Sequence, residues 1–231
     1  MSSEQGITAT GLPMSSEQGI TATGLTVVYG ELVAVADVSF RVPPGFVLAV
    51  SGPSGAGKSS LLWALAGAVA PQSGTVELDG VPVVDRPGAS KQGVVLIPQG
   101  NGLARVLTAR ENLALPLLAE GKKDVDHVIA EALTAVGLEE SGDHLVEELS
   151  GGEQQRVAVA RGLAQQGRVV LADESTSELD STNRERVLDL LRQEAERGAA
   201  VIIATHDPNV AASADGHATM DEGHLSWQRR L

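Results

Sequence analysis

The stretch GPSGAGKS, residues 52–59, fits the pattern G-x-x-x-x-G-K-[ST]. It follows FVLAVSG (46–52), an apolar stretch that predicts a buried strand, and it opens KSSLLWALAGAV (58–69), which has helical periodicity. Glycines let backbone N–H groups close around an anion, and the start of a helix adds partial positive charge. Lys58 would add a point charge and Ser59 a hydroxyl for Mg²⁺. The pattern predicts a phosphate-binding loop, in which the contacting residues are Gly52, Ser54, Gly55, Ala56, Gly57, Lys58, Ser59 and Ser60.

A second apolar stretch, VVLADE (169–174), ends in two carboxylates. A buried strand that ends in Asp delivers a charge to the edge of the sheet, beside a phosphate loop that follows another strand. Asp173 is therefore expected to hold Mg²⁺ through water. Glu174 is expected to point at an attacking water and to act as general base. An isolated Asp-Glu pair after a strand would be a solvated turn, so it is the phosphate loop that favours the catalytic interpretation.

Strands and helices alternate along the chain, which predicts an α/β core. Besides the strand at 46–52, strands are expected at 25–30, 35–42, 75–80, 93–99, 168–173, 199–205 and 217–223, and a helix at 181–198. Residues 103–166 instead contain three helical stretches in succession, LTARENLALPLLAEG, DVDHVIAEALTAVGL and SGGEQQRVAVARGLAQQ. This block is interpreted as a helical insertion in the sheet.

The composition narrows the possible partners. Of the 231 residues, 42% are hydrophobic, which is enough for the core of one large domain. The formal net charge of −13 argues against a general nucleic-acid binder, which presents a basic face. Cysteine is absent, so disulfides and Cys-based metal sites are excluded. No signal peptide is recognised, and apolar stretches are interrupted before about 20 residues, so a membrane role would have to come through a partner.

The N-terminus carries a perfect repeat, because MSSEQGITATGL at residues 1–12 recurs at residues 14–25 with only Pro13 between the copies. A solenoid needs longer units and about three or more of them. We interpret Met14 as the natural start and residues 1–13 as an extension duplicated through cloning or start-site choice. The alternative is a genuine N-terminal arm that pairs on a sheet edge. Residues 14–231 are then expected to form a single domain.

LSGGEQQR, residues 149–156, together with the two stretches above resembles the signature set of ATP-binding-cassette (ABC) ATPases. The resemblance runs from about residue 22 to residue 225. It implies an α/β fold with a P-loop NTPase (RecA-like) core sheet, an N-terminal antiparallel β subdomain and an α-helical subdomain inserted at about 103–166. It also implies that Ser150, Gly151 and Gly152 contact ATP bound to a second, head-to-tail subunit. Two glycines at a helix start leave bare N–H groups for a phosphate, which suits that role.

Four further residues match the family pattern one by one. Tyr29 is where the family stacks an aromatic ring on adenine. Gln99 follows the strand VVLIP, where the family's glutamine contacts Mg²⁺ and the attacking water. Asp180, in SELD, resembles the aspartate that communicates across the dimer. His206, in ATHD, resembles the histidine that contacts the γ-phosphate.

Two positions depart from the family pattern. Ser175 replaces the usual proline after the catalytic glutamate, and because proline would fix φ there, a looser loop is expected. GNG (100–102) follows Gln99 where an aromatic residue is common, which puts the detailed coupling contact in question. The matches imply catalytic roles for Lys58, Gln99, Glu174 and His206, and metal ligation by Ser59, Gln99 and Asp173.

The resemblance implies an ATPase that uses ATP and Mg²⁺. Two subunits, expected to be identical, would close around ATP and drive a separate integral-membrane permease from the cytoplasmic face of the cell membrane. TARENLALPLLAEGKK (108–123), LADE followed by TSELD, and THDPNVA (205–211) are similar to the lipoprotein-release and macrolide-efflux branch, which favours export or force transmission across the membrane. The alternatives are an importer ATPase and a soluble assembly ATPase of the iron–sulfur scaffold type. No nucleic-acid partner is expected.

Overall fold

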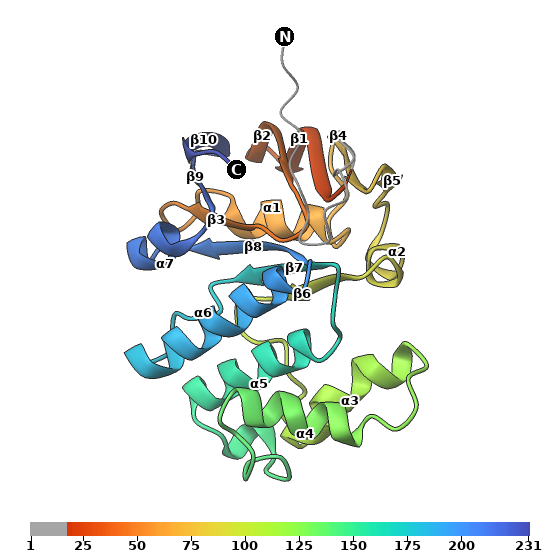
Figure 1. The fold of residues 1–231 in the computed structure, drawn as a ribbon. Coiled ribbons are helices and arrows are strands. Elements are labelled where there is room, and N and C mark those ends of the chain that lie inside the picture. Colours follow the sequence, from red (N-terminus) through yellow and green to blue (C-terminus); the bar gives the residue numbers. More distant parts are fainter. Residues whose placement is uncertain (1–17) are drawn as a thin grey trace.

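The computed structural model of the chain describes residues 18–231, so the interpretation of Met14 as the start and of residues 1–13 as an extension lies outside the described residues. One sheet is antiparallel with the strand order β2-β1-β4-β5. Its strands are β1 (Ile20–Tyr29), β2 (Leu32–Val42), β4 (Ser73–Leu78) and β5 (Val81–Pro82). In Figure 1 this sheet lies at the top, at the end of the molecule opposite α3, α4 and α5.

The second sheet has the order β10-β9-β3-β8-β7-β6, in which all neighbours are parallel except the β9–β10 pair. Its strands are β3 (Val47–Ser51), β6 (Val94–Ile97), β7 (Val169–Asp173), β8 (Ala200–Thr205), β9 (Gly216–Asp221) and β10 (His224–Arg229). Parallel strands place their carboxyl ends at one edge of the sheet. The order β3-β8-β7 therefore brings the phosphate loop, the end of β8 and the end of β7 to the same edge.

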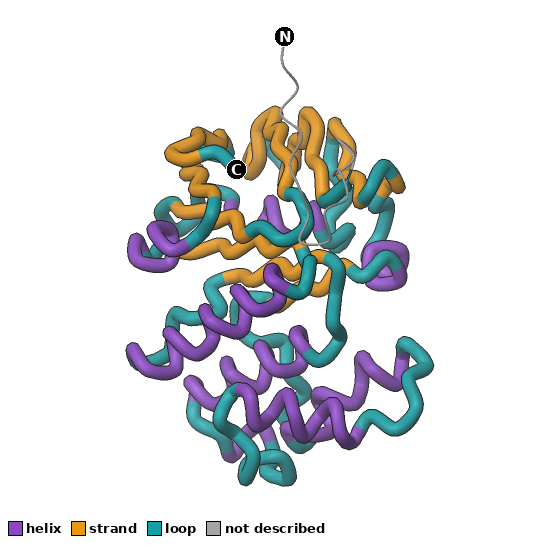
Figure 2. The backbone as a smooth tube through the Cα atoms, viewed as in Figure 1, coloured by secondary structure: helices purple, strands orange, loops and turns teal. Residues whose placement is uncertain are grey.

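The helices cover this sheet in two groups (Figures 1 and 2). They are α1 (Lys58–Leu65), α2 (Arg86–Lys91), α3 (Ala109–Ala119), α4 (Asp126–Ala135), α5 (Gly151–Leu163), α6 (Ser181–Glu196) and α7 (Pro208–Ser213), with a 3₁₀ turn at Val146–Glu148. α1 lies between the two sheets, whereas α3, α4 and α5 follow one another between β6 and β7 and gather at the lower end of Figure 1. Within residues 18–231, no helix has the length and apolar character needed to cross a bilayer.

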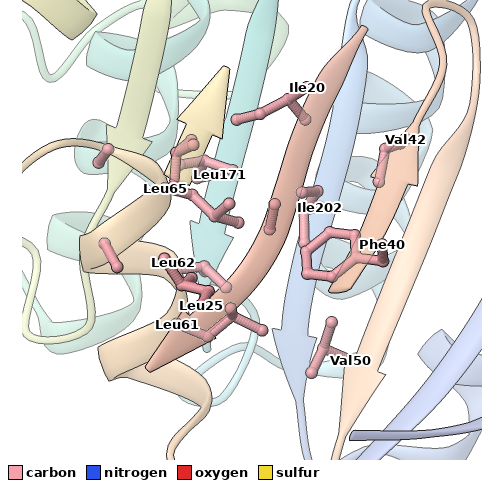
Figure 3. Packing of buried hydrophobic residues seen from close by; sticks show 14 of the residues in the cluster. Ile20, Leu25, Phe40, Val42, Val50, Leu61, Leu62, Leu65, Leu171 and Ile202 are labelled. Carbon is pink, nitrogen blue, oxygen red and sulfur yellow. The ribbon is translucent and has the colours of Figure 1, made fainter. Parts of the chain in front are cut away.

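The core has two parts, one on each face of the parallel sheet. The first lies between the sheets, where Figure 3 shows Leu61, Leu62 and Leu65 of α1 against Ile20 and Leu25 of β1. The second packs α3 to α6 onto the other face of the sheet. Strands β7 and β8 are buried along their whole length, as expected for parallel strands covered on both faces. The predicted α/β class, with its antiparallel β part and inserted helices, is confirmed.

Several predicted boundaries were wrong. β1 begins at Ile20, five residues before the expected start, and the side chains of Ile20 and Leu25 are fully buried. The second copy of the repeat therefore contributes to the core, although irregular pairing between Ala22 and Leu25 obscures the alternation in sequence. α1 ends at Leu65 instead of residue 69, and Gly67 has a left-handed φ of 66°. The short elements α2, α7, β5 and β10 were not predicted, because segments of two to six residues are too short to show a helical or strand periodicity in hydrophobicity.

Candidate functional site

The phosphate loop connects β3 to α1 and depends on two close backbone approaches. Gly57 is the N-cap of α1 with a φ of 102°, and a Cβ there would lie 2.0 Å from the Ala34 carbonyl oxygen. A Cβ on Gly52 would lie 2.2 Å from the Met220 carbonyl oxygen. Only glycine fits both positions. No side chain caps the start of α1, so its first N–H groups are available to an anion.

A cavity of about 410 Å³ opens over this loop. We call it the phosphate-loop cavity, and its lining residues are Tyr29, Leu32, Ala34, Ser54, Gly55, Gly57, Lys58, Ser59, Ser60, Gln99 and Glu174. Two residues predicted for the loop lie outside this lining: Gly52 lines a separate pocket together with His206, and Ala56 packs into the core. Leu32 and Ala34 line the cavity and were not predicted. Their only sequence signal is their position on the strand that follows Tyr29.

Lys58 is buried at the base of the cavity. Its ammonium donates hydrogen bonds to the carbonyl oxygens of Gly52, at 2.8 Å, and Pro53, at 3.1 Å. Its Nζ also lies 3.6 Å from Oε1 of Glu174. In this state the lysine charge is held by the loop and by one carboxylate. A phosphate in the loop would compete with both for the same ammonium.

Glu174 follows β7 in a left-handed conformation with a φ of 50°, which is unusual for a residue other than glycine. Its N–H donates to the carbonyl oxygen of Ala204 in the neighbouring strand β8, at 3.0 Å. Its Oε2 lies 2.8 Å from Nδ1 of His206. Because Lys58 faces the other oxygen, the buried carboxylate is held between two basic side chains. The structure thus brings Lys58, Glu174 and His206 together from three separate motifs.

Asp173, the last residue of β7, is fully buried, and neither carboxylate oxygen has a hydrogen-bond partner. Burial raises the pKa of Asp173, and the charge of Glu174 adds to the rise, while Ser59 and Lys58 act in the opposite direction. A buried carboxylate without a partner fits a divalent cation. In the described part of the chain, no group of three or more His, Cys, Asp or Glu could hold a metal. Proteins bind Mg²⁺ through one or two carboxylates together with substrate phosphates, and Asp173 can supply one of those carboxylates.

The Ser-Gly-Gly stretch lies elsewhere, at the start of α5. Ser150 is the N-cap, and its side chain and that of Glu153 form a reciprocal capping box. A pocket of about 230 Å³ lies there, which we call the signature pocket. Its lining residues are Ser150, Gly152, Glu153, Arg156, Glu178, Leu179, Asp180 and Asn183. It shares no lining residue with the phosphate-loop cavity.

Two acidic side chains of the signature pocket, Asp180 and Glu153, are already hydrogen-bonded. Asp180 caps α6 by accepting the N–H of Asn183 at 2.9 Å and its side-chain amide at 2.8 Å, and these bonds lower the pKa of Asp180. Hydrogen bonds from Ser150 likewise lower the pKa of Glu153. The structure therefore groups Asp180 with Ser150 and Gly152. It does not bring them to the phosphate loop of the same chain.

Three further polar residues were not predicted to contribute. Gln155 and Arg161 both project from α5 and hold loops of the site. Gln155 bonds the loop after β7, and Arg161 donates to the carbonyl oxygens of Asn101, at 2.8 Å, and Gly102, at 2.6 Å. Ser175 was noted only as a departure; it is buried, and its hydroxyl has no partner. Gln155 stands inside the quoted LSGGEQQR, whereas nothing near Arg161 in sequence indicates its distant partners.

Comparisons with known proteins identify the family to which this fold belongs. Residues 35–177 match the family model described as "ABC transporter". The similar solved structures include the dimeric structure of MJ0796, a bacterial ABC transporter cassette, at 31% identity and a TM-score of 0.84, covering 92% of this chain and 100% of that chain. A dimeric structure of a post-hydrolysis state of the cassette MJ0796 bound to ADP and Pi matches equally well. An ATP-binding subunit of an ABC transporter, 22% identical with a TM-score of 0.82, covers 91% of this chain and 90% of that chain and shows the fold alone.

Proposed function

The chain belongs to the ABC transporter family, and we propose that it is the ATP-hydrolysing subunit of a membrane transporter that drives a separate permease. The chain is an ATPase, and its cofactors are ATP and Mg²⁺. The proposed working unit is a head-to-tail pair of cassettes with two nucleotides at their interface. The permease would hold this pair at the cytoplasmic face of the cell membrane.

One observation carries the paired arrangement: the two halves of the expected site occupy separate pockets. Lys58 and Glu174 line the phosphate-loop cavity, next to the buried Asp173, whereas Ser150 and Gly152 line the signature pocket. A single chain therefore cannot apply both sets to one phosphate group. A second cassette in the opposite orientation would add its signature pocket to the phosphate-loop cavity of the first. The dimeric form of the similar cassette supports this arrangement.

In the proposed reaction, the glycine-rich loop and the start of α1 bind the nucleotide phosphates, and Tyr29 stacks on the base. Bound Mg²⁺, held by Ser59, Gln99 and Asp173, would neutralise charge on the phosphates. Lys58 leaves its carbonyl partners for the phosphate, which also releases one oxygen of Glu174.

The freed Glu174 carboxylate orients a water and takes its proton, while the water oxygen bonds to the γ-phosphorus and the bond from that phosphorus to the departing ADP breaks. His206, which bonds Glu174 in the nucleotide-free structure, would contact the γ-phosphate. The N–H groups of the partner's signature pocket would stabilise the charge that develops on it. Loss of the γ-phosphate removes the bridge between the cassettes, so the pair reopens. Asp180 is proposed to contact the second cassette and so to communicate between the two sites.

The permease is proposed to be of the lipoprotein-release or macrolide-efflux type, with a large extracytoplasmic domain. The similarity of residues 108–123 and 205–211 to that branch supports this choice. Apolar side chains near α3 support a protein partner, since Val106, Leu115 and Leu118 are 75%, 53% and 57% exposed. An importer-type permease is the competing partner.

The test uses Glu174→Gln, which should bind ATP without completing hydrolysis. With MgATP we expect this variant to double its molar mass in light scattering after size exclusion, and with MgADP to remain monomeric. A mass unchanged by MgATP, although fluorescent ATP binds, would contradict the paired arrangement. The matched control is Glu174→Gln combined with Lys58→Ala, which should not dimerise.

The same MgATP-closed variant then serves as bait against detergent-solubilised host membranes. Recovery of a polytopic protein with a large extracytoplasmic domain is the expected result. Recovery of a permease without such a domain would redirect the assignment to another transporter branch. Recovery of only soluble scaffold proteins would contradict the transporter and indicate an assembly ATPase.

A further inference from the structure

Gln155 of α5 is one of few polar side chains buried in the described chain, with 6% of its surface exposed. Its Nε2 donates a hydrogen bond to the carbonyl oxygen of Glu174 at 2.8 Å. Its Oε1 accepts the N–H of Glu178 at 3.0 Å. One amide therefore spans the loop after β7 from its first residue to its fifth. To make both bonds, a side chain must carry a donor and an acceptor at the same distance from its Cα as the glutamine amide. Among the neutral side chains only glutamine does so.

The carbonyl that Gln155 holds belongs to a residue in an unfavourable conformation. Glu174 has a φ of 50°, and a non-glycine residue keeps such a conformation only when its surroundings impose it. Its N–H is anchored on Ala204, and its carbonyl oxygen accepts from Gln155 and from Ser177, whose hydroxyl lies 3.0 Å away. Of these anchors, only Gln155 comes from outside the sheet and the loop itself. The N–H of Ser177 also donates to the Glu174 carbonyl oxygen, at 3.2 Å. Loss of Gln155 would therefore leave this carbonyl held only from within its own loop.

We infer that Gln155 is a positioning residue, which holds the Glu174 backbone so that its carboxylate faces the phosphate-loop cavity. This rests on the proposed function, because it takes Glu174 as the base. Gln155 also stands five residues after Ser150 on the helix that presents the Ser-Gly-Gly stretch. It therefore ties the surface that faces the partner's nucleotide to the base that acts on the chain's own nucleotide.

The first test replaces Gln155 by Met, which has similar length and neither donor nor acceptor. We expect kcat for ATP hydrolysis to fall about tenfold or more, since small misplacement of a reacting group is costly. We expect KM for ATP to stay within about twofold, because Gln155 does not line the phosphate-loop cavity. The matched control is Gln165→Met on the same chain segment, where the side chain bonds only the Arg161 carbonyl oxygen. That variant should keep wild-type kcat.

The second test, Gln155→Glu, separates positioning from packing through pH. The new carboxyl can still accept from Glu178, but only its protonated form can donate to the Glu174 carbonyl oxygen. Burial raises the pKa of a carboxyl group, so protonation is expected within the assayable range. The ratio of variant to wild-type kcat should therefore rise as pH falls. The charged or ionisable neighbours Lys58, Glu174, Glu178 and His206 are the same in both proteins, so the ratio isolates the change at residue 155.

The same pH series on Gln155→Met should give a flat ratio, because methionine does not titrate. The inference is overturned if Gln155→Met keeps more than half of wild-type kcat, or if the Gln155→Glu ratio does not change with pH. If Gln155→Met does not fold, as judged by circular dichroism, the pH ratio of Gln155→Glu decides alone. A wild-type chain that hydrolyses no ATP would instead contradict the proposed function.

Discussion

Asp173, beside the phosphate-loop cavity, and two carboxylates of the signature pocket, Glu153 and Asp180, have surroundings with opposite effects on their pKa values. Next to Glu174 of the cavity, Asp173 is buried without a hydrogen-bond partner, and burial raises its pKa. In the signature pocket, hydrogen bonds lower the pKa of Glu153 and of Asp180, and both cap helices. The carboxylate of Asp173 therefore lacks a partner until a cation binds beside it together with a phosphate. The signature pocket is complete by itself, so its contribution to a reaction must come from the N–H groups and carbonyls that it presents outward.

Replacing one glutamate by glutamine in each pocket should give the largest difference in turnover between the two. Glu174→Gln should lower turnover by about 100-fold or more, because it removes the proposed base. Glu153→Gln should leave turnover within about twofold, because glutamine also completes a capping box. Steady-state phosphate release measures both. Similar losses in the two variants would mean that the pockets do not differ as proposed.

A glycine pair gives the next largest contrast. Gly57→Ala should destabilise the fold by roughly 2–3 kcal/mol, since its Cβ would lie 2.0 Å from a backbone oxygen at a left-handed φ. Gly151→Ala should stabilise it by about 0.5 kcal/mol, because the new Cβ meets only the flexible end of Glu178 and alanine favours the helix. Urea denaturation checks both values. If Gly151 acts on the partner's nucleotide, its variant should nevertheless lose turnover.

An aspartate pair tests the opposite pKa shifts. In metal-free protein at neutral pH, Asp173→Asn should raise stability by about 1–2 kcal/mol, because it removes a buried unpaired charge. The raised folded pKa means that the native state binds the proton more tightly than the unfolded state, so wild-type stability falls as pH rises through that pKa. The gain from Asp173→Asn should therefore shrink toward acid pH. Melting temperature against pH, with Mg²⁺ chelated, measures this gain.

For Asp180, the second aspartate of this pair, stability depends on pH in the opposite direction. The lowered pKa of Asp180 means that its stabilising contribution is present above the ordinary aspartate pKa and is lost as pH falls. Asp180→Asn should change the melting temperature little, because asparagine caps a helix about as well as aspartate. A large gain in stability for Asp180→Asn, or a loss for Asp173→Asn, would contradict the comparison.

The smallest expected effect concerns the rim of the cavity. Tyr29 is 41% exposed, and the signature pocket has no aromatic side chain in its lining. Tyr29→Ala should weaken ATP binding by about 1 kcal/mol, roughly fivefold, with little change in stability. Tyr29→Trp should restore the affinity. Titration with a fluorescent nucleotide gives both numbers, and equal affinities for the alanine variant and wild type would exclude stacking at this residue.

Much of the fold and of the cavity follows from sequence because the signals are local. The phosphate loop is a strand, a glycine-rich turn and a helix start within residues 46–69, and the pair Asp173-Glu174 ends an unbroken apolar strand. Their meeting also follows, since parallel strands share an edge. The early start of β1 at Ile20 and the short elements such as α7 and β10 do not follow, because no clear period distinguishes them.

The local patterns of the sequence thus identified the candidate groups: the loop expected to bind phosphate, the carboxylates expected to act beside it, and the helix start that carries the Ser-Gly-Gly stretch. How these groups are held depends on contacts between distant parts of the chain. Gln155 reaches Glu174 across 19 positions of sequence, and Arg161 reaches Gly102 across 59. The separation of Ser150 from the phosphate-loop cavity likewise depends on how α5 packs. Such contacts join residues distant in the chain, and a single side chain carries no local pattern that names its partner.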